Sequence, residues 1–462
     1  MSHVDVHRPT AARSARPEGH AERQCAREPT WRGHRLPEQV DLDAATTGGT
    51  VAVVGMGYVG LPTALSLLGS GARVIGLDAS SARLDAIWAQ DVDLLAQDRR
   101  QLSAQLHSSS FELTDDPGRL ATADTVIVCV PTPITEHLTP DLEALQGACR
   151  AVVANARVGQ TMILTSTTYV GCTRDLLQAP LAERGLRVGV DVCVAFSPER
   201  IDPGVASHVP AATPRVVGGV SPECTRRAAA ALARTCPEVH EVSSPEVAEM
   251  TKLLENTFRA VNIALANEVG EIAGHLGLSA REVIDAAATK PYGFMPFYPG
   301  PGVGGHCIPC DPHYLLWQLR ADRVASPVIT AAMTEISLRP RRVVDRLAEL
   351  LADHGRPLHG ARIHVVGVAY KPGVADVRES PAVQIISECL AAGAEVTYTD
   401  RYVPQLQVGD ITLDSTAGSD VTADVVLVHT RHPDVELTWL ADHEVVLDGT
   451  LRLDDVPQSV PL

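Results

Sequence analysis

The segment Pro301-Gly-Val-Gly-Gly-His-Cys-Ile-Pro-Cys-Asp311 has the residue types needed for nucleophilic chemistry on a carbonyl carbon. Three glycines precede Cys307, so the backbone can bring its N–H groups close to a thiolate or an oxyanion. A thiol reacts as the thiolate, and its pKa must be lowered for it to act near neutral pH. The segment therefore makes Cys307 a candidate nucleophile.

Two other chemistries fit part of the same segment. It offers four potential zinc ligands: His306, Cys307, Cys310 and His313. A structural zinc site normally takes a second ligand pair from elsewhere in the chain, and no C-x-x-C or H-x-x-x-H pair supplies one. A thioredoxin-like dithiol would follow a strand and open a helix. We expect no metal here.

A second motif indicates a dinucleotide site. The apolar run Val51–Val54 is followed at once by Gly55-Met-Gly-Tyr-Val-Gly60, and a helix is expected from Leu61-Pro62. In G-x-G-x-x-G, Gly55 permits the turn, Gly57 lets the backbone approach a pyrophosphate, and Gly60 lets helix and strand pack closely. A pyrophosphate then meets the N–H groups of the helix N-terminus.

The residue after the next expected strand selects the dinucleotide. Asp78 follows the run 73–77, and its carboxylate can accept both ribose hydroxyls, which favours NAD over NADP. Arg83 could instead pair with a 2′-phosphate, but Asp78 would repel that phosphate. The alternative, a structural glycine turn with no ligand, remains open at this point.

The stretch from Pro245 to Leu276 predicts a long helix. Its apolar residues recur at spacings of three, four and seven, which indicates one buried stripe: Val247, Met250, Leu254, Val261, Leu265, Val269, Ile272 and Leu276. Another face carries Lys252 and Asn256, four residues apart, with Arg259 and Asn267 within about 60° of them. Such a polar face is either the wall of a site or a solvated surface.

The remaining strand candidates give the fold class. Strands alternate with helices at 125–130, 161–165 and 192–196, and again at 362–367, 395–400 and 424–429. We expect an α/β protein of two Rossmann-like, doubly wound domains, joined by the long central helix and a small helical dimerisation domain. Residues 1–46 lack an apolar period and predict a disordered extension.

Composition excludes several classes. The chain has 462 residues, 45% of them hydrophobic, and a net charge of −17, which disfavours nucleic acids and anionic membranes as partners. No apolar run approaches the ~20 residues that span a bilayer, and the N-terminus has no apolar signal segment. The ten cysteines are scattered, as in reduced proteins, so we expect a cytoplasmic location.

These motifs, in this order, resemble the UDP-glucose/UDP-mannosaminuronate dehydrogenase family over nearly all of residues 50–455. The resemblance rests on seven segments: Gly55–Leu61, Val130-Pro-Thr-Pro133, Ser166-Thr-Thr168, Ser197-Pro-Glu-Arg200, Lys252-x-x-x-Asn256, Gly302–Cys307, and Ala369-Tyr-Lys-Pro372 with Asp376, Arg378, Ser380 and Pro381. Chance agreement over seven ordered segments is not credible.

The resemblance implies an NAD-dependent nucleotide-sugar 6-dehydrogenase that serves uronic acid biosynthesis. Two hydrides pass to two NAD molecules, and Cys307 forms a thiohemiacetal and then a thioester that water hydrolyses. In the family's terms, Lys252 and Asn256 stabilise the alkoxide or oxyanion, and Asp311 handles protons. Glu199 helps to activate water, and Thr132 helps to position it.

The resemblance also implies two sets of binding residues and a homodimer. NAD is expected to contact Gly55, Gly57, Tyr58, Val59, Gly60, Asp78, Arg83, Thr132, Ser166, Thr167 and Arg378. The nucleotide sugar is expected to contact Glu199, Arg200, Lys252, Asn256, Arg259, Gly304 and Lys371. Lys290-Pro291 occupies the region from which some glucose-specific members send an arginine into the neighbouring subunit, so a contact of this kind stays open.

The domain limits follow from these assignments. We expect an extension at 1–46, an NAD-binding Rossmann domain at 47–240, a central helical and dimerisation domain with the cysteine loop at 241–345, and a nucleotide-sugar-binding α/β domain at 346–462. Because Lys371 and Arg378 belong to the last of these, the site is expected between domains.

The substrate and the reaction class each keep alternatives. UDP-glucose and a UDP-N-acetylhexosamine fit equally, and dTDP-glucose in secondary metabolism is a further option. A two-electron hydroxyacid-type dehydrogenase would share the fold but would not need Cys307. A redox-sensing or sugar-binding protein on the same scaffold would be expected to have lost Cys307, Lys252 or Asp311, and all three are present.

Overall fold

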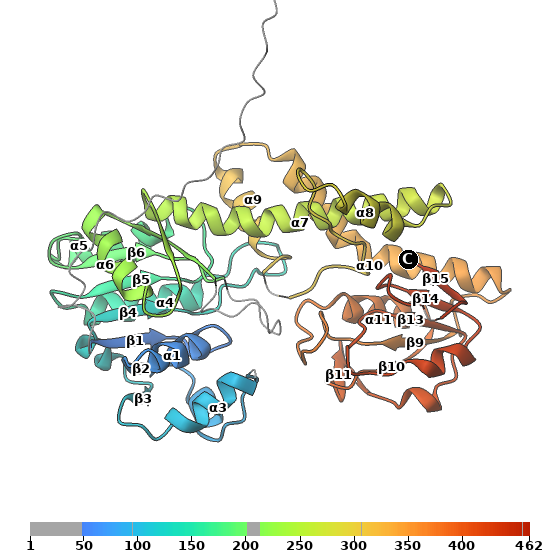
Figure 1. The fold of residues 1–462 in the computed structure, drawn as a ribbon, viewed down its shortest axis with the longest axis horizontal. Helices are drawn as coiled ribbons and strands as arrows, with labels where there is room; N and C mark the ends of the chain where they lie inside the picture. The colour runs from blue at the N-terminus through green and yellow to red at the C-terminus, as the bar shows by residue number, and fades with distance from the viewer. Residues whose placement is uncertain (1–48, 95, 201–212, 306, 455) are drawn as a thin grey trace, which may run out of the picture. The chain divides into compact units, whose positions relative to one another are not determined.

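The structure is a computed structural model whose ribbon is drawn in Figure 1. It describes residues 49–94, 96–200, 213–305, 307–454 and 456–462. The extension predicted at 1–46 lies outside these residues. The described chain forms two large sheets, one mostly and one wholly parallel, with a helical segment between them in sequence, and a two-stranded antiparallel sheet near the C-terminal one.

The N-terminal sheet has eight strands in the order β3-β2-β1-β4-β5-β6-β7-β8. Neighbouring strands are parallel except β6 and β7, which are antiparallel. The first six strands therefore have the order of a dinucleotide-binding fold, as predicted. The strands are β1 (Thr50–Val54), β2 (Arg73–Leu77), β3 (Phe111–Thr114), β4 (Thr125–Val128), β5 (Thr161–Leu164), β6 (Cys193–Phe196), β7 (Arg215–Gly219) and β8 (Val239–Val242).

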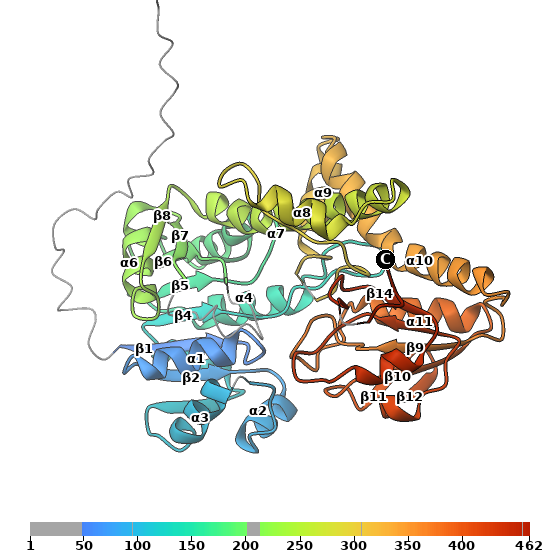
Figure 2. The ribbon, with the colours of Figure 1, turned by 45° about the vertical axis from the view of Figure 1, so that its right-hand side comes forward.

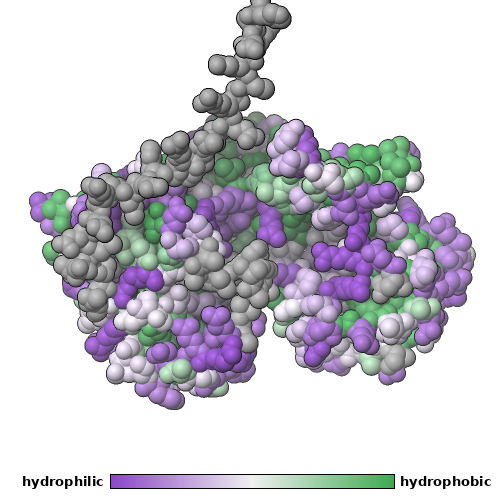
Figure 3. All heavy atoms as spheres, viewed as in Figure 1, coloured by the Kyte–Doolittle hydropathy of each residue, from purple (hydrophilic) through white to green (hydrophobic). Residues whose placement is uncertain are grey.

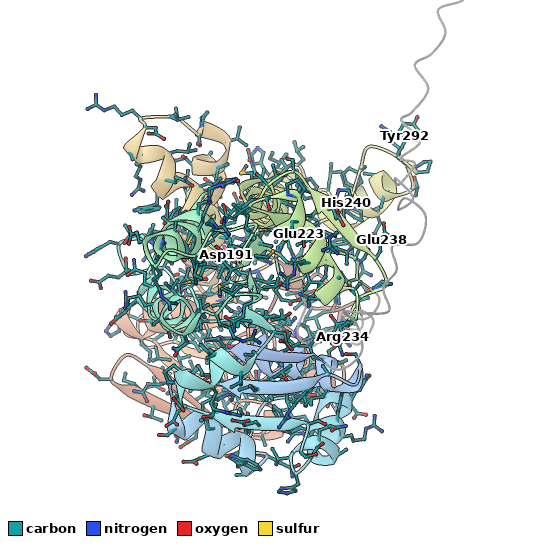
Figure 4. The ribbon with its side chains drawn as sticks, turned by 90° about the vertical axis from the view of Figure 1, so that its left-hand side faces the viewer. Asp191, Glu223, Arg234, Glu238, His240 and Tyr292 are labelled. Atoms are coloured by element: carbon teal, nitrogen blue, oxygen red, sulfur yellow. The ribbon has the colours of Figure 1, made fainter. Side chains whose placement is uncertain are left out.

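Helices cover both faces of this sheet, which is why its inner strands β1, β4, β5 and β6 are almost entirely buried and do not alternate, whereas the edge strands β3 and β8 contain polar residues. One buried cluster joins Leu65 and Leu102 to one face, and another joins Leu145 and Val152 to the other. Figure 4 looks at the β8 side of the sheet, where Glu238 and His240 are labelled. The helices are α1 (Gly60–Gly69), α2 (Ser81–Trp88), α3 (Ala96–Gln105), η2 (Pro117–Thr122), α4 (Glu143–Asn155), η3 (Arg174–Gln178), α5 (Ala179–Glu183) and α6 (Pro222–Leu232).

The long helix predicted after Pro245 is α7 (Pro245–His275), whose first turn is capped by Ser244 Oγ, which accepts the N–H of Val247. Within the single chain most of the predicted stripe is uncovered. Leu254, Leu265 and Ile272 are at least half exposed, and Val247, Met250 and Leu276 are exposed too. The buried face instead carries small residues such as Ala260, Ala264 and Gly270, because these allow close helix packing.

Three more helices complete the central segment: α8 (Ala280–Ala288), α9 (Asp311–Ala321) and α10 (Pro327–Asp353). Ala260 and Ala264 of α7 pack against Met333 and Ile336 of α10 in one buried cluster. Arg339 of α10 donates to the carbonyl of Gly300 at 2.8 Å and pairs with Glu271 of α7. These contacts fix the loop that leads to Cys307 against two helices.

The C-terminal sheet has five parallel strands in the order β10-β9-β13-β14-β15. Its main buried cluster joins Val344 and Leu347 of α10 to Ile385 of α11 and to Val365 and Leu427 of the sheet (Figure 2). The elements are β9 (Arg362–Val366), α11 (Pro381–Ala391), β10 (Glu395–Thr399), β11 (Gln405–Val408), β12 (Ile411–Asp414), η5 (Gly418–Asp420), β13 (Val425–Val428), η6 (Thr438–Asp442), β14 (Val446–Asp448) and β15 (Ser459–Pro461). The second doubly wound unit is thus confirmed.

Two further observations bear on the sequence predictions. No helix within the described ranges is both long and apolar enough to cross a membrane. All nine cysteines that the structure describes are free thiols, and Cys129 and Cys193 are buried in or beside strands, as expected.

Candidate active site

The first glycine turn has the geometry that a dinucleotide needs. Gly55 has φ +89°, and a Cβ there would lie 2.6 Å from the carbonyl oxygen of Cys129. A Cβ on Gly60 would lie 1.7 Å from the carbonyl oxygen of Gly55, so α1 can start there only with glycine. A Cβ on Gly57 would meet no atom within 4 Å. Gly55 and Gly60 are therefore required by the turn itself, whereas Gly57 borders open space where a pyrophosphate fits.

Asp78 and Arg83 both contact this turn. The Asp78 carboxylate accepts the N–H of Met56 at 2.8 Å and of Ser80 at 2.9 Å, one on each oxygen. A carboxylate has about four acceptor positions, so Asp78 retains capacity for ribose hydroxyls. Arg83 Nε donates to the carbonyl of Met56 at 2.8 Å. This bond holds the guanidinium of Arg83 beside the turn.

Tyr58 and Arg378 are in contact, although they are far apart in the sequence. Both were predicted to contact NAD. The guanidinium of Arg378 is 4.5 Å from the centroid of the Tyr58 ring, within the range of a cation–π contact. Arg378 also pairs with Asp376, with Nε to Oδ1 at 2.9 Å. Its carbonyl accepts the N–H of Gly305 at 3.0 Å. Arg378 thus connects the glycine turn to the loop that carries Cys307.

The glycines before Cys307 are needed because the 370–381 segment packs on them. A Cβ on Gly304 would lie 2.5 Å from Cβ of Tyr370, and one on Gly302 would lie 2.6 Å from Cγ of Pro381. After this contact the chain enters α9, where the Cys307 carbonyl accepts the N–H of Asp311 at 2.8 Å. Cys307 therefore lies immediately before the N-terminus of a helix.

Asp311 is the centre of a buried polar cluster. It is 2% exposed, and its carboxylate accepts hydrogen bonds from Asn256 of α7 and from the side chain of Thr167. Burial raises the pKa of Asp311 to about 6, while the charge of Lys252 and the bonds from Asn256 and Thr167 oppose that rise. Asp311 is therefore ionised at neutral pH but is a stronger base than an exposed aspartate.

Cys307 shares this electrostatic environment. Burial raises the pKa of the Cys307 thiol to about 11, and the nearby Asp311 charge adds to the rise. The charges of Lys252, Arg378 and Arg259 act in the opposite direction. Cys307 is thus a neutral thiol in this structure, and it needs a proton acceptor to become a nucleophile. Asp311 is the carboxylate whose charge acts on this thiol.

Glu199 is held by an arginine that the sequence did not single out. Its carboxylate pairs with Arg215 at 2.8 Å and accepts the N–H of Arg200 at 2.8 Å. Its backbone carbonyl accepts Lys252 Nζ at 2.9 Å. Arg200 itself pairs with Glu255 of α7. Arg215 begins a buried strand, where a charge is unusual, and that was the available sequence signal.

The remaining predicted residues occupy several places around this cluster. Ser166 Oγ accepts the N–H of Val130 at 3.0 Å, which ties the ends of β5 and β4 together, and the carbonyl of Thr132 accepts Tyr314 Oη at 3.1 Å. Val59 forms the N-cap of α1. Lys371 lies 5.7 Å from the centroid of the Tyr370 ring.

Two further residues of α7 have structural roles that the helical pattern did not predict. Asn267 is buried and accepts the N–H of Gly300 at 3.0 Å, so it holds the loop and does not line an open site. Glu249 is buried and accepts the N–H groups of Gly171 and Thr173 at 2.6 and 2.9 Å. This carboxylate binds the loop after β5 to α7.

A separate cavity of about 270 Å³ lies beside the loop that leads to Cys307. Its walls come from the loop before Cys307 and from the ends of C-terminal strands: Tyr298, Pro299, Gly300, Pro301, Gly302, Tyr370, Pro372, His429, Thr430, Arg431, Gly449, Thr450 and Arg452. The volume is near the lower end of the range for small-molecule sites, ~300–1,000 Å³. The sequence motifs did not predict this cavity because its residues come from four separate segments.

The metal alternative gains no support from the part of the chain that the structure describes. Within it, no three His, Cys, Asp or Glu side chains are grouped as ligands for a metal ion. His306, one of the four potential ligands, lies outside the described residues. Cys310 does precede a helix, but the residues before Cys307 form a loop and no strand, so the redox-dithiol pattern is only half present.

Comparison with known families accounts for the three parts of the chain. Residues 49–235 match the NAD binding domain of the UDP-glucose/GDP-mannose dehydrogenase family. Residues 246–335 match the family's central domain, and residues 364–455 match its UDP binding domain.

Individual relatives agree with this assignment. A UDP-N-acetyl-D-mannosamine dehydrogenase of Pyrococcus horikoshii is 33% identical over 88% of this chain and 96% of its own. A UDP-N-acetyl-D-glucosamine 6-dehydrogenase of Pseudomonas aeruginosa is 35% identical over 76% of this chain and 83% of its own. The solved structure of the UDP-D-ManNAc dehydrogenase from Pyrococcus horikoshii superimposes with a TM-score of 0.81 at 31% identity, covering 89% of this chain and 98% of its own.

These likenesses extend over both sheets and the helical segment between them, and they include the glycine turn and the cysteine loop. The chain belongs to the UDP-glucose/GDP-mannose dehydrogenase family and is an NAD-dependent nucleotide-sugar dehydrogenase.

Proposed function

We propose that the chain oxidises the C6 hydroxyl of a UDP-N-acetylhexosamine to a carboxylate, a four-electron reaction through a thioester on Cys307. The observation that carries the proposal is the cluster of Cys307, Asp311, Asn256 and Lys252, which combines a thiol, a base and hydrogen-bond donors. A two-electron oxidation would need no nucleophile. NAD, when bound, would supply the hydride acceptor, and one NAD would be reduced in each of the two oxidations.

The residues proposed to hold NAD are those at the first glycine turn. Gly57 leaves room for the pyrophosphate and Asp78 retains acceptor positions for the ribose. Tyr58, Val59 and Gly60 present backbone N–H groups at the start of α1. Arg83 and Arg378 add positive charge beside the turn. The remaining members of the proposed set are Thr132, Ser166 and Thr167.

Asp311 is the proposed proton acceptor in the first half of the reaction. Because its pKa is about 6, it is ionised at neutral pH and can take the proton of the C6 hydroxyl. Asn256 donates one N–H to Asp311, and an amide has a second N–H to offer. Lys252 likewise spends one donor on the Glu199 carbonyl and keeps others. Both side chains can therefore stabilise an oxyanion at C6.

Cys307 is the proposed nucleophile in the second half. Once Asp311 has released the C6 hydroxyl proton to water, the sulfur adds to the aldehyde carbon, the carbonyl electrons move to oxygen, and the thiol proton passes to the Asp311 carboxylate. The resulting oxyanion receives hydrogen bonds from Lys252 and Asn256. After the second oxidation, water cleaves the thioester and restores the thiol. We assign the orientation of this water and substrate to Glu199 and Thr132.

Sugar recognition is proposed for residues around the same cluster. Arg259 follows Lys252 and Asn256 on α7, and Arg200 is fixed by its pair with Glu255 of the same helix. Gly304 gives the loop its close contact with Tyr370, next to Lys371. The N-acetylhexosamine is chosen over glucose because the relatives quoted above act on N-acetylated sugars.

A panel of nucleotide sugars tests this proposal. The purified chain is assayed for NAD reduction with the UDP derivatives of N-acetylglucosamine, N-acetylmannosamine, N-acetylgalactosamine and glucose, and with dTDP-glucose. We expect kcat/KM for one N-acetylhexosamine to exceed that for UDP-glucose by about tenfold or more, the size of effect that a dedicated pocket gives. Preference for UDP-glucose or dTDP-glucose would overturn the sugar assignment and leave the family intact.

We also propose domain limits near residues 240 and 345. The first falls within β8 (Val239–Val242), the last strand of the N-terminal sheet, so the nearest break between elements lies just after it, before α7 begins at Pro245. The second lies within α10 (Pro327–Asp353), so this helix would belong to both neighbours. Its first half packs on α7 and its second half packs on the C-terminal sheet.

The exposed apolar face of α7 supports a homodimer. Met250, Leu254 and Leu265 are 40–57% exposed, and Tyr292, from the loop after α8, projects away from the body in Figure 4. Apolar side chains also gather over α7 and α8 in Figure 3. Patches of this kind mark interfaces, and a second copy is the simplest cover. Leu265→Asp should dissociate or precipitate the protein; light scattering that shows an active wild-type monomer would contradict the dimer.

A further inference from the structure

Two loops of the N-terminal sheet lie at the edge where the first glycine turn lies. Residues 129–134, the β4 loop, follow β4, and residues 165–171, the β5 loop, follow β5; both strands run parallel to β1. In an open parallel sheet, ligands bind outside the carboxyl ends of the strands. Ser166 Oγ joins the two loops, because it accepts the N–H of Val130 at 3.0 Å and donates to the carbonyl of Val130 at 2.8 Å.

Helix α9 is attached to each of these loops by one polar side chain. Tyr314 Oη donates to the carbonyl of Thr132 in the β4 loop at 3.1 Å. Gln318 makes two bonds to Val170 of the β5 loop. Its Oε1 accepts the Val170 N–H at 3.0 Å, and its Nε2 donates to the Val170 carbonyl at 2.8 Å. Tyr314 and Gln318 are four residues apart, so they lie on the same face of α9.

Apolar contacts hold the same two loops against α9. The rings of Tyr169 and Trp317 meet edge to face, with their centroids 5.7 Å apart. Ile134 of the β4 loop and Val170 of the β5 loop pack against the buried cluster that contains Tyr314. Because Ser166 also joins the loops to each other, the two loops and α9 form one packed unit.

The same helix begins at the cysteine loop. Asp311 is the first residue of α9, and its N–H donates to the carbonyl of Cys307 at 2.8 Å. Tyr314 lies about one turn further along the helix, and Gln318 about two turns. Hydride transfer requires the reacting atoms to be held in close contact, and a displacement of about 1 Å can slow a reaction about a hundredfold. Helix α9 is therefore placed to set that distance.

We propose that Tyr314 and Gln318 are positioning residues that act through α9 to fix the cysteine loop relative to the nicotinamide end of NAD. The inference rests on the proposed function, because it takes Cys307 and Asp311 as the groups that act at C6 and the two loops as contacts of NAD. Neither side chain needs to touch a substrate. The first glycine turn supplies most of the NAD affinity, so loss of either attachment slows hydride transfer and leaves that affinity nearly unchanged.

Gln318→Met tests this role, because methionine keeps the length of the side chain and removes both amide groups. The enzyme is mixed rapidly with saturating NAD and the best sugar of the nucleotide-sugar panel, and the first NADH is followed by absorbance. Deuterium at C6 of the sugar identifies the phase that reports hydride transfer. The rate of this phase should fall by about tenfold to a hundredfold. The dissociation constant of NAD should change by less than about threefold.

Hydrogen exchange gives a second measurement on Gln318→Met, made without NAD or sugar. Exchange of the β5-loop amides, followed by mass spectrometry, should be faster than in the wild type. The reason is that the Val170 N–H loses its acceptor and the loop opens more often. Unchanged exchange in this loop would show that Gln318 does not hold it, and would overturn the proposal.

Tyr314→Phe is a milder test at the β4 loop. Phenylalanine keeps the ring in its buried cluster and removes only the hydroxyl that bonds to the Thr132 carbonyl. The first-NADH rate should fall by about threefold to tenfold, less than in Gln318→Met because one bond is lost and not two. The affinity for NAD should again change little.

Gln160→Met is the matched control. Gln160 precedes β5, at the end of the strand opposite the β5 loop, and its amide also bonds to backbone groups. Its Nε2 donates to the carbonyls of Leu120 and Ala123 at 2.8 Å each, and its Oε1 accepts the N–H of Arg157 at 2.8 Å. The control should lower the melting temperature at least as much as Gln318→Met, because three bonds are lost at a buried site. Its first-NADH rate should stay within about twofold of wild type.

The outcomes separate the inference from the function on which it rests. Wild-type protein that forms one NADH per sugar, or oxidises no nucleotide sugar, would defeat the proposed function. Two NADH per sugar, with first-NADH rates of Gln318→Met and Tyr314→Phe within about twofold of wild type, would overturn the positioning role alone. Equal slowing by Gln318→Met and Gln160→Met would also overturn it, since the effect would then follow stability. A loss of NAD affinity as large as the loss of rate would do the same.

Discussion

The two glycine turns of this chain are built alike at their first residue and differ after it. Gly55 follows β1 and Gly367 follows β9, both with positive φ, at +89° and +75°. A Cβ would lie 2.6 Å from the Cys129 carbonyl oxygen at Gly55 and 2.0 Å from the Thr430 carbonyl oxygen at Gly367. Each turn therefore needs its glycine for the same reason, a close approach to the strand in the middle of the sheet.

The next residues separate the two turns. The first reads Gly55-Met-Gly-Tyr-Val-Gly60, and the second reads Gly367-Val-Ala-Tyr-Lys-Pro372. Gly57 borders open space, whereas Ala369 is fully buried. The contact of Gly60 with Gly55 lets α1 begin at once, but α11 begins only at Pro381. The second turn therefore presents no helix N-terminus to a pyrophosphate at this point.

The aspartates that follow β2 and β10, the strands next to the two turns, also differ in how many hydrogen bonds they accept. Asp78 accepts two backbone N–H groups and is partly exposed. Asp400 is 4% exposed, and its carboxylate accepts four backbone N–H groups and lies 3.2 Å from His432 Nε2. Asp400 thus has no acceptor position left for a ribose, whereas Asp78 has. The first turn and Asp78 therefore keep room and acceptor positions for a cofactor, whereas the second turn and Asp400 position the 370–380 segment.

The loop that carries Cys307 packs on the second turn. The largest predicted effect tests whether this loop supplies the nucleophile. Cys307→Ser should lower the rate of uronate formation by about a thousandfold or more, because the covalent step loses its nucleophile. Cys310→Ser should stay within a fewfold of wild type, since Cys310 is a buried thiol without a proposed role. Both rates come from direct quantification of uronate, and near-normal uronate output from Cys307→Ser would defeat the covalent step.

The second prediction converts the first turn into a copy of the second. Gly57→Ala with Gly60→Pro should weaken NAD binding by about a hundredfold or more. The Cβ at residue 57 enters the pyrophosphate space, and a Cβ at residue 60 would lie 1.7 Å from the Gly55 carbonyl oxygen, so α1 can no longer begin there. UDP binding, measured by calorimetry on the same sample, should change by less than about threefold and serves as the folding control. Unchanged NAD affinity would mean that the turns do not differ in the way described.

The third prediction contrasts the two acids. Asp78→Ala should weaken NAD by about tenfold and improve NADP relative to NAD, with little change in melting temperature. Asp400→Ala should leave NAD affinity alone and lower the free energy of unfolding by about 2–4 kcal/mol, since several buried donors lose their acceptor. Matched effects of the two substitutions on NAD would refute the contrast.

The smallest expected effect is a dependence of kcat/KM on pH that arises from Asp311, close to the cysteine loop. Because burial raises the pKa of Asp311 to about 6, this carboxylate becomes protonated as the pH falls through 6 and then cannot accept a proton. We expect kcat/KM to be halved near pH 6 and to fall tenfold for each lower pH unit. Asp311→Asn should be slow at every pH and lack this limb. A wild-type acid limb near pH 4 would show that Asp311 is not the base.

The sequence predicted those parts of the fold that depend on local pattern. The two parallel sheets, the glycine turn and the long helix all follow from runs of apolar residues and glycine spacing, and each was confirmed. Contacts in the candidate active site also agree with the sequence pattern. Lys252 and Asn256, four residues apart on one helix, contact Glu199 and Asp311 respectively.

Contacts between distant segments could not be predicted. The apolar stripe of α7 was expected to be buried, but the structure buries its alanines and glycines, because periodicity identifies an apolar face without saying what covers it. Arg215 and Glu249 were missed for a related reason. Each acts through a partner in another segment of the chain, Glu199 or Thr173.

The stoichiometry of the reaction tests the central claim most directly. A limiting, measured amount of the best UDP-N-acetylhexosamine is converted to completion with excess NAD, and NADH and uronate are both quantified. The account predicts two NADH and one uronate per sugar, with no aldehyde released. One NADH per sugar with an aldehyde or ketone product would contradict the thioester on Cys307 and place the chain with two-electron dehydrogenases.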